Sequence, residues 1–294
     1  MKLGKLGVWA SLDGLSAADA ASFAKRVEKR GYAALWTPES RGRNVIASAA
    51  WLLANTERLV VASGIANIYA RDAMAMANGQ RGLAEQSGGR FLLGLGVSHV
   101  PMVATLRGHQ YGAPVPTMRR YLEAMKAAPY QAPAPAEPPP TVLAALGPKM
   151  LALAATAADG AHPYNVTPEH TAEARRILGP TKLLCPEQMV LLETDAAKAR
   201  AGARAALASY LALENYVNNW RRLGFGDADF SGGGSDRLID ATIAWGDETA
   251  IRKRIQAHWD AGADHVCIQP LPPDGARLKL DERILDLLAP AGRT

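Results

Sequence analysis

The segment Leu146-Gly147-Pro148-Lys149 has the residue order of a binding site for an anion. An apolar run ends at Leu146, Gly147 leaves the backbone open, and Pro148 suits the first turn of a helix. The N–H groups at the start of a helix favour a bound anion, and Lys149 adds a positive charge. A phosphate is therefore a candidate ligand, although many helices without a ligand also begin with Gly-Pro.

A second segment, Ser63-Gly64-Ile65-Ala66-Asn67, places a glycine inside an apolar run. Glycine weakens a strand and often marks a bulge or a point where a ligand approaches the backbone. A flat ring against this backbone would explain Gly64. A neighbouring core side chain that needs the space would explain it equally, so both interpretations stay open.

The motifs of several other enzyme classes are absent from the sequence. It contains no Gly-x-Ser-x-Gly, His-x-His or Cys-x-x-Cys pattern, so neither a hydrolytic triad nor a metal site is predicted. Cys185 and Cys267 lie far apart in the sequence, and we expect both to be buried thiols. A nicotinamide-dependent barrel reductase would need a constellation of Tyr, Lys, His and Asp, which the sequence does not present.

The composition is that of a folded protein, with 48% hydrophobic and 21% charged residues and a net charge of +5. The positive charges are spread along the chain without aromatic residues between them, so no nucleic-acid partner is expected. Residues 1–5 lack the apolar core of a signal peptide, and no apolar stretch reaches the roughly 18 residues of a membrane span. We therefore expect a cytoplasmic protein without a membrane partner.

A regular alternation of strands and helices must position these segments. Apolar runs that predict strands lie near residues 5, 34, 62, 93, 144, 162, 190 and 267, and most are separated by one helix. Residues 17–30, for example, have apolar residues at helical spacing between a capping Ser16 and a terminating Gly31. The alternation predicts parallel strands with right-handed crossovers, and eight such units favour a closed (β/α)8 TIM barrel of the α/β class.

We expect a single barrel domain over residues 1–294, with a helical insertion at 214–244 before the last strand. The first strand-to-helix turn, residues 10–14, has no Gly-x-Gly-x-x-Gly, which argues against an open dinucleotide-binding sheet. Residues 129–140 contain six prolines. Such a segment can link two domains or wrap the edge of a barrel, and the pattern of elements that resumes after it favours the second interpretation.

The active site of such a barrel lies at the carboxyl ends of the strands. This rule brings together Glu39, Asn67, Ser98, His99 and His162, each of which follows a predicted strand. We expect His99 to be the catalytic acid or base, because imidazole titrates near neutral pH. Glu39 is the second candidate for this role.

Several motifs of the chain match a known family. Residues 83–96 read Leu-Ala-Glu-Gln-Ser-Gly-Gly-Arg-Phe-Leu-Leu-Gly-Leu-Gly, and further matching segments are residues 61–65, 71–72, 144–150, 159–164 and 261–266. Together they resemble the bacterial luciferase-like monooxygenase superfamily, and more closely the coenzyme F420-dependent oxidoreductases of actinobacteria. The resemblance covers most of the chain except roughly residues 195–244. One departure is Ala73, where many members have a proline two residues after the arginine that is Arg71 here.

The resemblance implies a barrel, usually dimeric, that binds a deazaflavin or flavin at the carboxyl end of the strands. A bulge on the third strand, often with a cis peptide bond, would support the ring, and residues after the second and fourth strands would line it. The Gly147 turn would hold the phosphate of the cofactor tail. The expected cofactor-binding residues are Ser63, Gly64, Ile65, Asn67, Ser98, Ala145, Leu146, Gly147, Pro148, Lys149 and His162.

The implied activity is that of an oxidoreductase that uses coenzyme F420, with FMN as the alternative cofactor. Hydride would pass between the ring and an electrophilic carbon of a small organic substrate, such as a carbonyl, an imine or an activated alkene. Two other functions stay open: an FMN-dependent luciferase-like monooxygenase, and a non-catalytic barrel that binds coenzyme F420 as a carrier or sensor. A homodimer is also expected.

Overall fold

The computed structural model describes residue 1, residues 3–276 and residues 279–290. Within these residues, the strands form one parallel sheet of eleven strands. The strands are β1 (Leu6–Trp9), β2 (Ala34–Thr37), β3 (Val60–Ser63), β4 (Ala66–Asn67), β5 (Phe91–Gly96), β6 (Thr141–Leu143), β7 (Gly160–Ala161), β8 (Leu183–Leu184), β9 (Glu187–Leu192), β10 (Ala244–Gly246) and β11 (Val266–Leu271).

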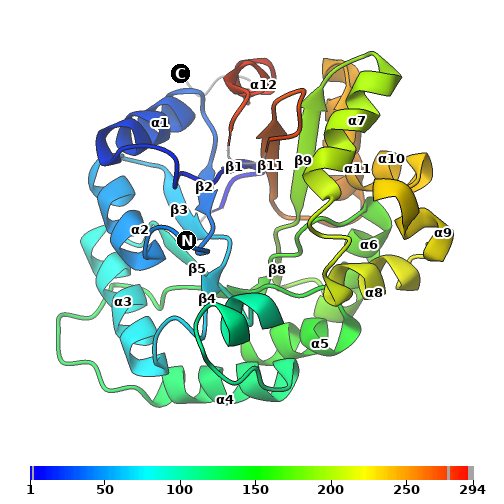
Figure 1. The fold of residues 1–294 in the computed structure, drawn as a ribbon. Coiled ribbons are helices and arrows are strands. Elements are labelled where there is room, and N and C mark those ends of the chain that lie inside the picture. Colours follow the sequence, from blue (N-terminus) through cyan, green and yellow to red (C-terminus); the bar gives the residue numbers. More distant parts are fainter. Residues whose placement is uncertain (2, 277–278, 291–294) are drawn as a thin grey trace.

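Helices surround this sheet (Figure 1). They are α1 (Ala17–Lys29), α2 (Val45–Ala54), α3 (Ala73–Gln86), α4 (Pro114–Ala127), α5 (Pro148–Ala157), α6 (Pro168–Leu178), α7 (Ala196–Leu207), α8 (Glu214–Arg222), α9 (Asp227–Phe230), α10 (Asp236–Thr242), α11 (Glu248–Asp260) and α12 (Glu282–Leu287), with a π-helix at Pro101–Thr105 and a 3-10 turn at Ser231–Gly233. No helix of the described residues is long and apolar enough to span a membrane.

The strand order β10-β9-β11-β1-β2-β3-β5-β6-β7-β8 shows that the sheet curls. β8 and β9 are joined by Cys185 and Pro186, and backbone hydrogen bonds connect this short link to the segment after β7 on one side and to β11 on the other. The Glu187 amide donates to the Pro163 carbonyl at 2.9 Å, and the Cys267 amide donates to the Pro186 carbonyl at 3.1 Å. The observed sheet therefore has the parallel pairing and the curvature that the predicted barrel requires.

The predicted strands are confirmed near all eight positions, and β4, β8 and β10 are short additional strands. The predicted start of α1 is also confirmed, because the Ser16 hydroxyl accepts a hydrogen bond from the Asp19 amide at 3.1 Å. Residues 97–115, between β5 and the body of α4, are irregular only in part, because Pro101–Thr105 is helical and α4 begins at Pro114. Proline at a helix start, where no N–H is needed, explains both.

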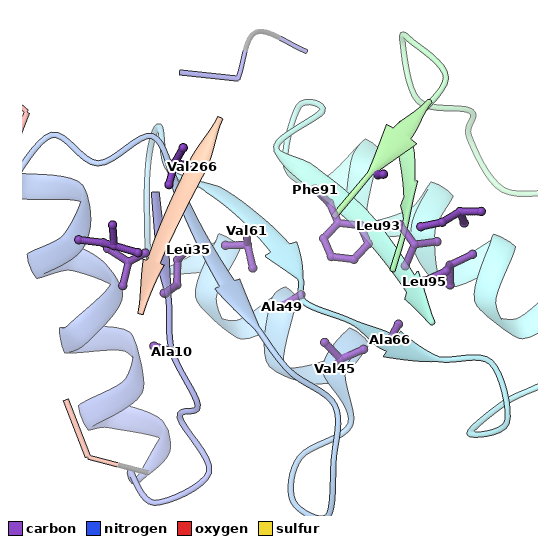
Figure 2. Packing of buried hydrophobic residues seen from close by; sticks show 14 of the residues in the cluster. Ala10, Leu35, Val45, Ala49, Val61, Ala66, Phe91, Leu93, Leu95 and Val266 are labelled. Atoms are coloured by element: carbon purple, nitrogen blue, oxygen red, sulfur yellow. The ribbon is translucent and has the colours of Figure 1, made fainter. Parts of the chain in front are cut away.

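Three apolar cores flank the strands, and one of them packs β9 against α7, α8 and α10 around Leu191 and Trp220. The outer core lies between sheet and helices, where Val61 packs with Val45 and Ala49 of α2 (Figure 2). The inner core fills the curl of the sheet around Trp36, whose indole Nε1 donates to His265 Nε2 at 3.1 Å. Because the strands are buried on both faces, their sequences are continuous apolar runs rather than alternating ones.

The proline-rich segment 129–140 leads from α4 to β6. Gln80 of α3 holds its end, because the Gln80 amide nitrogen donates to the carbonyls of Pro139 and Pro140, each at 3.1 Å. The Pro140 carbonyl also accepts from the Leu93 amide of β5 at 3.2 Å. These contacts fix the point at which the chain enters the sheet again.

Candidate functional site

The third strand has a bulge at the residues where one was expected. Ala62 of β3 pairs with Leu92, whereas Ala66 of β4 pairs with Leu95, so the third strand has one residue more than β5 between these pairs. The peptide bond between Gly64 and Ile65 is cis. The Ser63 hydroxyl replaces the missing ladder bonds, since it donates to the Gly94 carbonyl and accepts from the Gly94 amide, each at 2.9 Å.

The inner side of Gly64 is packed against core side chains. A Cβ on this residue would lie 2.7 Å from Trp9 Nε1 and 3.1 Å from His162 Nε2. Trp9 Nε1 also donates a hydrogen bond to the Gly64 carbonyl at 3.1 Å. The need for glycine is thus explained by packing, the second of the two interpretations of the sequence. Ile65 is the half-buried residue of the bulge, and its side chain lies against Gly96.

Glu39 is bonded to both ends of this bulge. Its amide donates to the Ile65 carbonyl at 3.2 Å, and its carboxylate accepts from the Asn67 amide at 2.9 Å. The same carboxylate accepts from the Val45 amide at 3.2 Å and forms an ion pair with Arg71. The Asn67 amide, the Val45 amide and Arg71 occupy the carboxylate oxygens, so the geometry suits a positioning role better than proton transfer.

Asn67 and Ser98 are held by hydrogen bonds at the ends of the third strand and of β5. Asn67 is buried, and its side-chain oxygen accepts from the Tyr69 amide at 2.9 Å. Ser98 is half-buried with a φ of 56°, and its carbonyl accepts from the Tyr111 hydroxyl at 3.2 Å. A positive φ is unusual for serine and turns the chain sharply after β5. This turn brings His99 toward α8.

His99 is half-buried at the carboxyl end of β5. Its ring centroid lies 5.8 Å from that of Tyr216, and its side chain is hydrogen-bonded to Asn215. Burial lowers the pKa of His99, and the hydrogen bond with Asn215 partly offsets this effect. The imidazole is therefore mainly neutral at neutral pH.

An aromatic cluster, which we call the tyrosine cluster, lies beside His99 and consists of Tyr164, Tyr210 and Tyr216. The Tyr210 hydroxyl donates to the Tyr164 hydroxyl at 2.7 Å, which donates to the Gln269 side-chain oxygen at 2.7 Å. The Tyr164 ring also lies 5.2 Å from the ring of Trp9. Burial is the main reason why the pKa of Tyr164 is well above its usual value.

Tyr210 and Tyr216 were missed by the sequence reasoning. Both lie in the segment that the resemblance does not cover, and no pattern along the chain links them to the strand ends. Tyr164, in contrast, follows β7, and Gln269 lies within the last strand, β11, so their positions relative to the strands are a usable signal.

His162 is buried below the bulge. Its Nδ1 is bonded to the Cys185 carbonyl at 2.7 Å, and its ring stacks on Trp36 at 4.3 Å. Burial lowers the pKa of His162 to about 4. Its Nε2, on the side of Gly64, has no hydrogen-bond partner among the described residues. The residue thus lies in the inner core rather than on an exposed surface.

The anion segment begins α5 as predicted. Gly147 is the N-cap and Pro148 the first helical residue, and Lys149 is exposed. Ala145 is buried, and the Leu146 carbonyl accepts a hydrogen bond from His170 Nε2 at 2.8 Å. In the first turn of α5, Pro148 has no N–H and the Met150 amide donates to the Gly147 carbonyl at 3.1 Å, so the Lys149 amide is the N–H group that an anion would meet.

The predicted residues thus form two groups. Ser63, Gly64, Ile65 and Asn67 make the bulge, with Ser98 and His99 at the end of the adjacent β5. Residues 145–149 make the start of α5, after β6. The strands β5 and β6 pair with each other, so the two groups lie at neighbouring strand ends.

Comparison with known proteins agrees with the resemblance found in the sequence. Residues 3–265 match the model of the luciferase-like monooxygenase family. The chain belongs to this family. A protein of Mycobacterium tuberculosis named as a coenzyme F420-dependent oxidoreductase is 26% identical over an alignment of 325 positions including gaps, which covers 89% of this chain and 92% of the relative.

Two further family comparisons extend this result. The 5,10-methylenetetrahydromethanopterin reductase of Methanolobus tindarius is 26% identical over an alignment of 297 positions including gaps, which covers 86% of this chain and 91% of the relative. The structure of an F420-dependent secondary alcohol dehydrogenase in complex with an F420-acetone adduct superposes with a TM-score of 0.76 at 15% identity, and the match covers 98% of each chain. The structural likeness supports the fold.

Proposed function

We propose that this chain is an oxidoreductase that uses coenzyme F420. The observation that carries the proposal is the match of nearly the whole chain to two relatives named for coenzyme F420 or for a methylenetetrahydromethanopterin reductase activity. The membership in the luciferase-like family agrees with it. When bound, the deazaflavin supplies a hydride carrier that can exchange with a carbonyl, an imine or an activated alkene.

The described residues fit such a cofactor at both of its ends. At the ring end, Ile65 and Ser98 are half-buried at neighbouring strand ends and leave polar backbone beside them. At the tail end, Gly147 begins α5 without a capping side chain, and Lys149 is exposed next to it. A flat ring needs a half-buried surface with polar backbone groups at its edge, which the strand ends offer. A phosphate needs a helix start and a positive charge, which Gly147 and Lys149 offer.

His99 is our candidate for the group that moves the substrate proton. A neutral imidazole can accept a proton from a hydroxyl substrate through the ring nitrogen that does not face Asn215. The same nitrogen returns the proton in the opposite direction. Glu39 is assigned to positioning instead, because Arg71, Asn67 and Val45 occupy its carboxylate.

The tyrosine cluster would exclude water from the space beside His99. Tyr216 approaches His99, and Tyr210 and Tyr164 form a hydrogen-bonded pair next to Tyr216.

We also propose that residues 214–244 are an insertion into a single barrel domain and that the protein is a homodimer. Size-exclusion chromatography with light scattering tests the dimer.

A parallel titration with coenzyme F420, FMN and NADPH tests the cofactor. We expect saturable binding of coenzyme F420, seen as a change of its fluorescence, and no comparable binding of the other two. Tight binding of FMN without binding of coenzyme F420 would favour an FMN-dependent monooxygenase. Tight binding of coenzyme F420 without turnover of any carbonyl, imine or alkene would favour a carrier or sensor.

A further inference from the structure

Helix α8 brings an arginine to the start of α5. A Cβ built on Gly147 would lie 3.4 Å from Arg222 Nη2, 3.7 Å from Cζ and 3.9 Å from Nη1. The whole guanidinium group thus lies against the N-cap of α5. Figure 1 shows α8 on the same flank of the molecule as α5 and α6.

A buried amide holds this guanidinium. Arg222 Nη2 donates to the Asn219 side-chain oxygen at 3.1 Å, and Asn219 is 1% exposed. The nitrogen of the same amide, Nδ2, is buried and has no hydrogen-bond partner in the part of the chain that the structure describes. An unsatisfied buried donor costs free energy, so its presence beside the guanidinium points to a missing acceptor.

The groups that meet at this place are donors and positive charges. They are the Lys149 amide in the first turn of α5, the Arg222 guanidinium and the Asn219 amide nitrogen, with the Lys149 ammonium two residues after the N-cap. No carboxylate bonds to Arg222 among the described residues. Donors without an acceptor are the composition of an anion site.

We propose that Arg222 and Asn219 form the second wall of this anion site and that they recognise the phosphate-bearing tail of the cofactor. The inference rests on the proposed function, which it deepens by naming residues from outside the segments that resemble the family. Its ligand class is a phosphate ester, which a guanidinium can bind with two parallel hydrogen bonds.

This anion site also connects the cofactor tail to His99, the candidate proton-transfer residue, through α8. The helix that carries Arg222 and Asn219 carries Tyr216 as well, and the Tyr216 ring lies 5.8 Å from the ring of His99. An anion that bridges α5 and α8 would hold α8 in place. The bound tail therefore favours the position of α8 in which Tyr216 covers His99.

The test compares Arg222→Ala and Arg222→Lys with Arg221→Ala, a matched control. Arg221 is exposed on the same helix, but it pairs with Asp227 at 2.7 Å. Dissociation constants are measured by fluorescence for coenzyme F420 and for the ribityl deazaflavin, which keeps the ring and its ribityl chain but lacks the phosphate and the rest of the tail. Circular dichroism and the melting temperature establish that each variant is folded.

We expect Arg222→Ala to weaken coenzyme F420 binding by about tenfold to a hundredfold, the range of a charge-assisted hydrogen bond. Binding of the ribityl deazaflavin should be unchanged, Arg222→Lys should recover part of the loss, and Arg221→Ala should bind like the wild type. Equal binding of coenzyme F420 by Arg222→Ala and Arg221→Ala would overturn the inference. An equal loss for coenzyme F420 and the ribityl deazaflavin would also overturn it.

Inorganic phosphate separates this inference from the proposed function. We expect millimolar phosphate to raise the melting temperature of the wild type and of Arg221→Ala, but not that of Arg222→Ala. This result would support the anion site even if the wild type did not bind coenzyme F420. If phosphate affected the wild type and Arg222→Ala alike, the assignment of Arg222 would be wrong whatever the cofactor.

Discussion

Glu39 and Arg71 form a buried ion pair beside the bulge of the third strand, with side chains that are 4% and 10% exposed. The same carboxylate accepts the Asn67 amide, so one side chain neutralises a buried charge and fixes the end of the bulge. Removal of one partner of such a pair leaves the other charge buried without compensation.

We therefore expect Glu39→Ala to lower the free energy of unfolding by about 3–5 kcal/mol, the cost of breaking a buried pair. Glu39→Gln keeps an acceptor for the Asn67 amide and should cost less. Urea denaturation measures both. If Glu39→Gln folded and bound coenzyme F420 like the wild type but had no turnover at all, Glu39 would be a proton-transfer residue after all.

His99 provides the second prediction. His99→Ala should lower kcat by about 10²- to 10⁴-fold, the usual contribution of a general acid or base, with little change in the dissociation constant of coenzyme F420. His109 is exposed in the same loop, and His109→Ala is the matched control. Full turnover by His99→Ala would exclude it from proton transfer.

The pH profile of the wild type offers a separate check on His99. Burial lowers its pKa below the usual value of 6.5, so the neutral base persists as the pH falls below 6.5. The rate of hydroxyl oxidation should thus decline only below pH 6.5. The decline should be absent from the residual activity of His99→Ala.

Four buried histidines determine the third prediction, on acid stability, because burial lowers the pKa of His170 as well as those of the other three. Burial is the main cause that lowers the pKa of His162 and His265 to about 4, and that of His258 to about 3. Between about pH 6.5 and pH 4, the unfolded chain binds protons that the folded chain does not. The stability contributed by these neutral histidines is therefore complete above pH 6.5 and is lost as the pH falls.

Urea denaturation between pH 7 and pH 4.5 measures this loss. Each histidine should contribute a slope of up to about 1.4 kcal/mol per pH unit. His162→Gln removes one of the four groups and should reduce the slope, whereas His109→Gln, at an exposed position, should leave it unchanged. An equal slope for wild type and His162→Gln would show that His162 is protonated in the folded protein.

The fourth prediction concerns Gly64. A Cβ there would meet Trp9 Nε1 at 2.7 Å, so Gly64→Ala requires the indole to move and to weaken its hydrogen bond to the Gly64 carbonyl. We expect a loss of about 1–3 kcal/mol in the free energy of unfolding, as for other overpacked core sites. Gly14→Ala is the control, because a Cβ on Gly14 meets nothing within 4 Å. Equal stability of the two variants would contradict the packing seen at the bulge.

The sequence was sufficient for the features that depend on local patterns. Apolar runs located the strands, Ser16 and Gly31 located the ends of the first helix, and a glycine in a strand located the bulge. These features follow from residues close together in the chain, where backbone preference and hydrophobic period act directly.

The rest of the site depends on contacts between distant residues. Nothing near Glu39 in the sequence indicates that Arg71 and Asn67 occupy its carboxylate. The approach of Arg222 to Gly147, and of Tyr216 to His99, depends on how α8 packs against the sheet. Periodicity identifies a helix, but it does not indicate which strand end the helix meets.

The Ser63 hydroxyl bonds to both polar groups of the Gly94 backbone. The third strand can therefore leave its neighbour for one residue without exposing an unpaired edge. Alanine at this position would strand a carbonyl and an amide in the interior, whereas threonine would retain the two-way hydroxyl. Among natural variants of this chain, the permitted alternatives to serine at position 63 should thus be groups that both donate and accept.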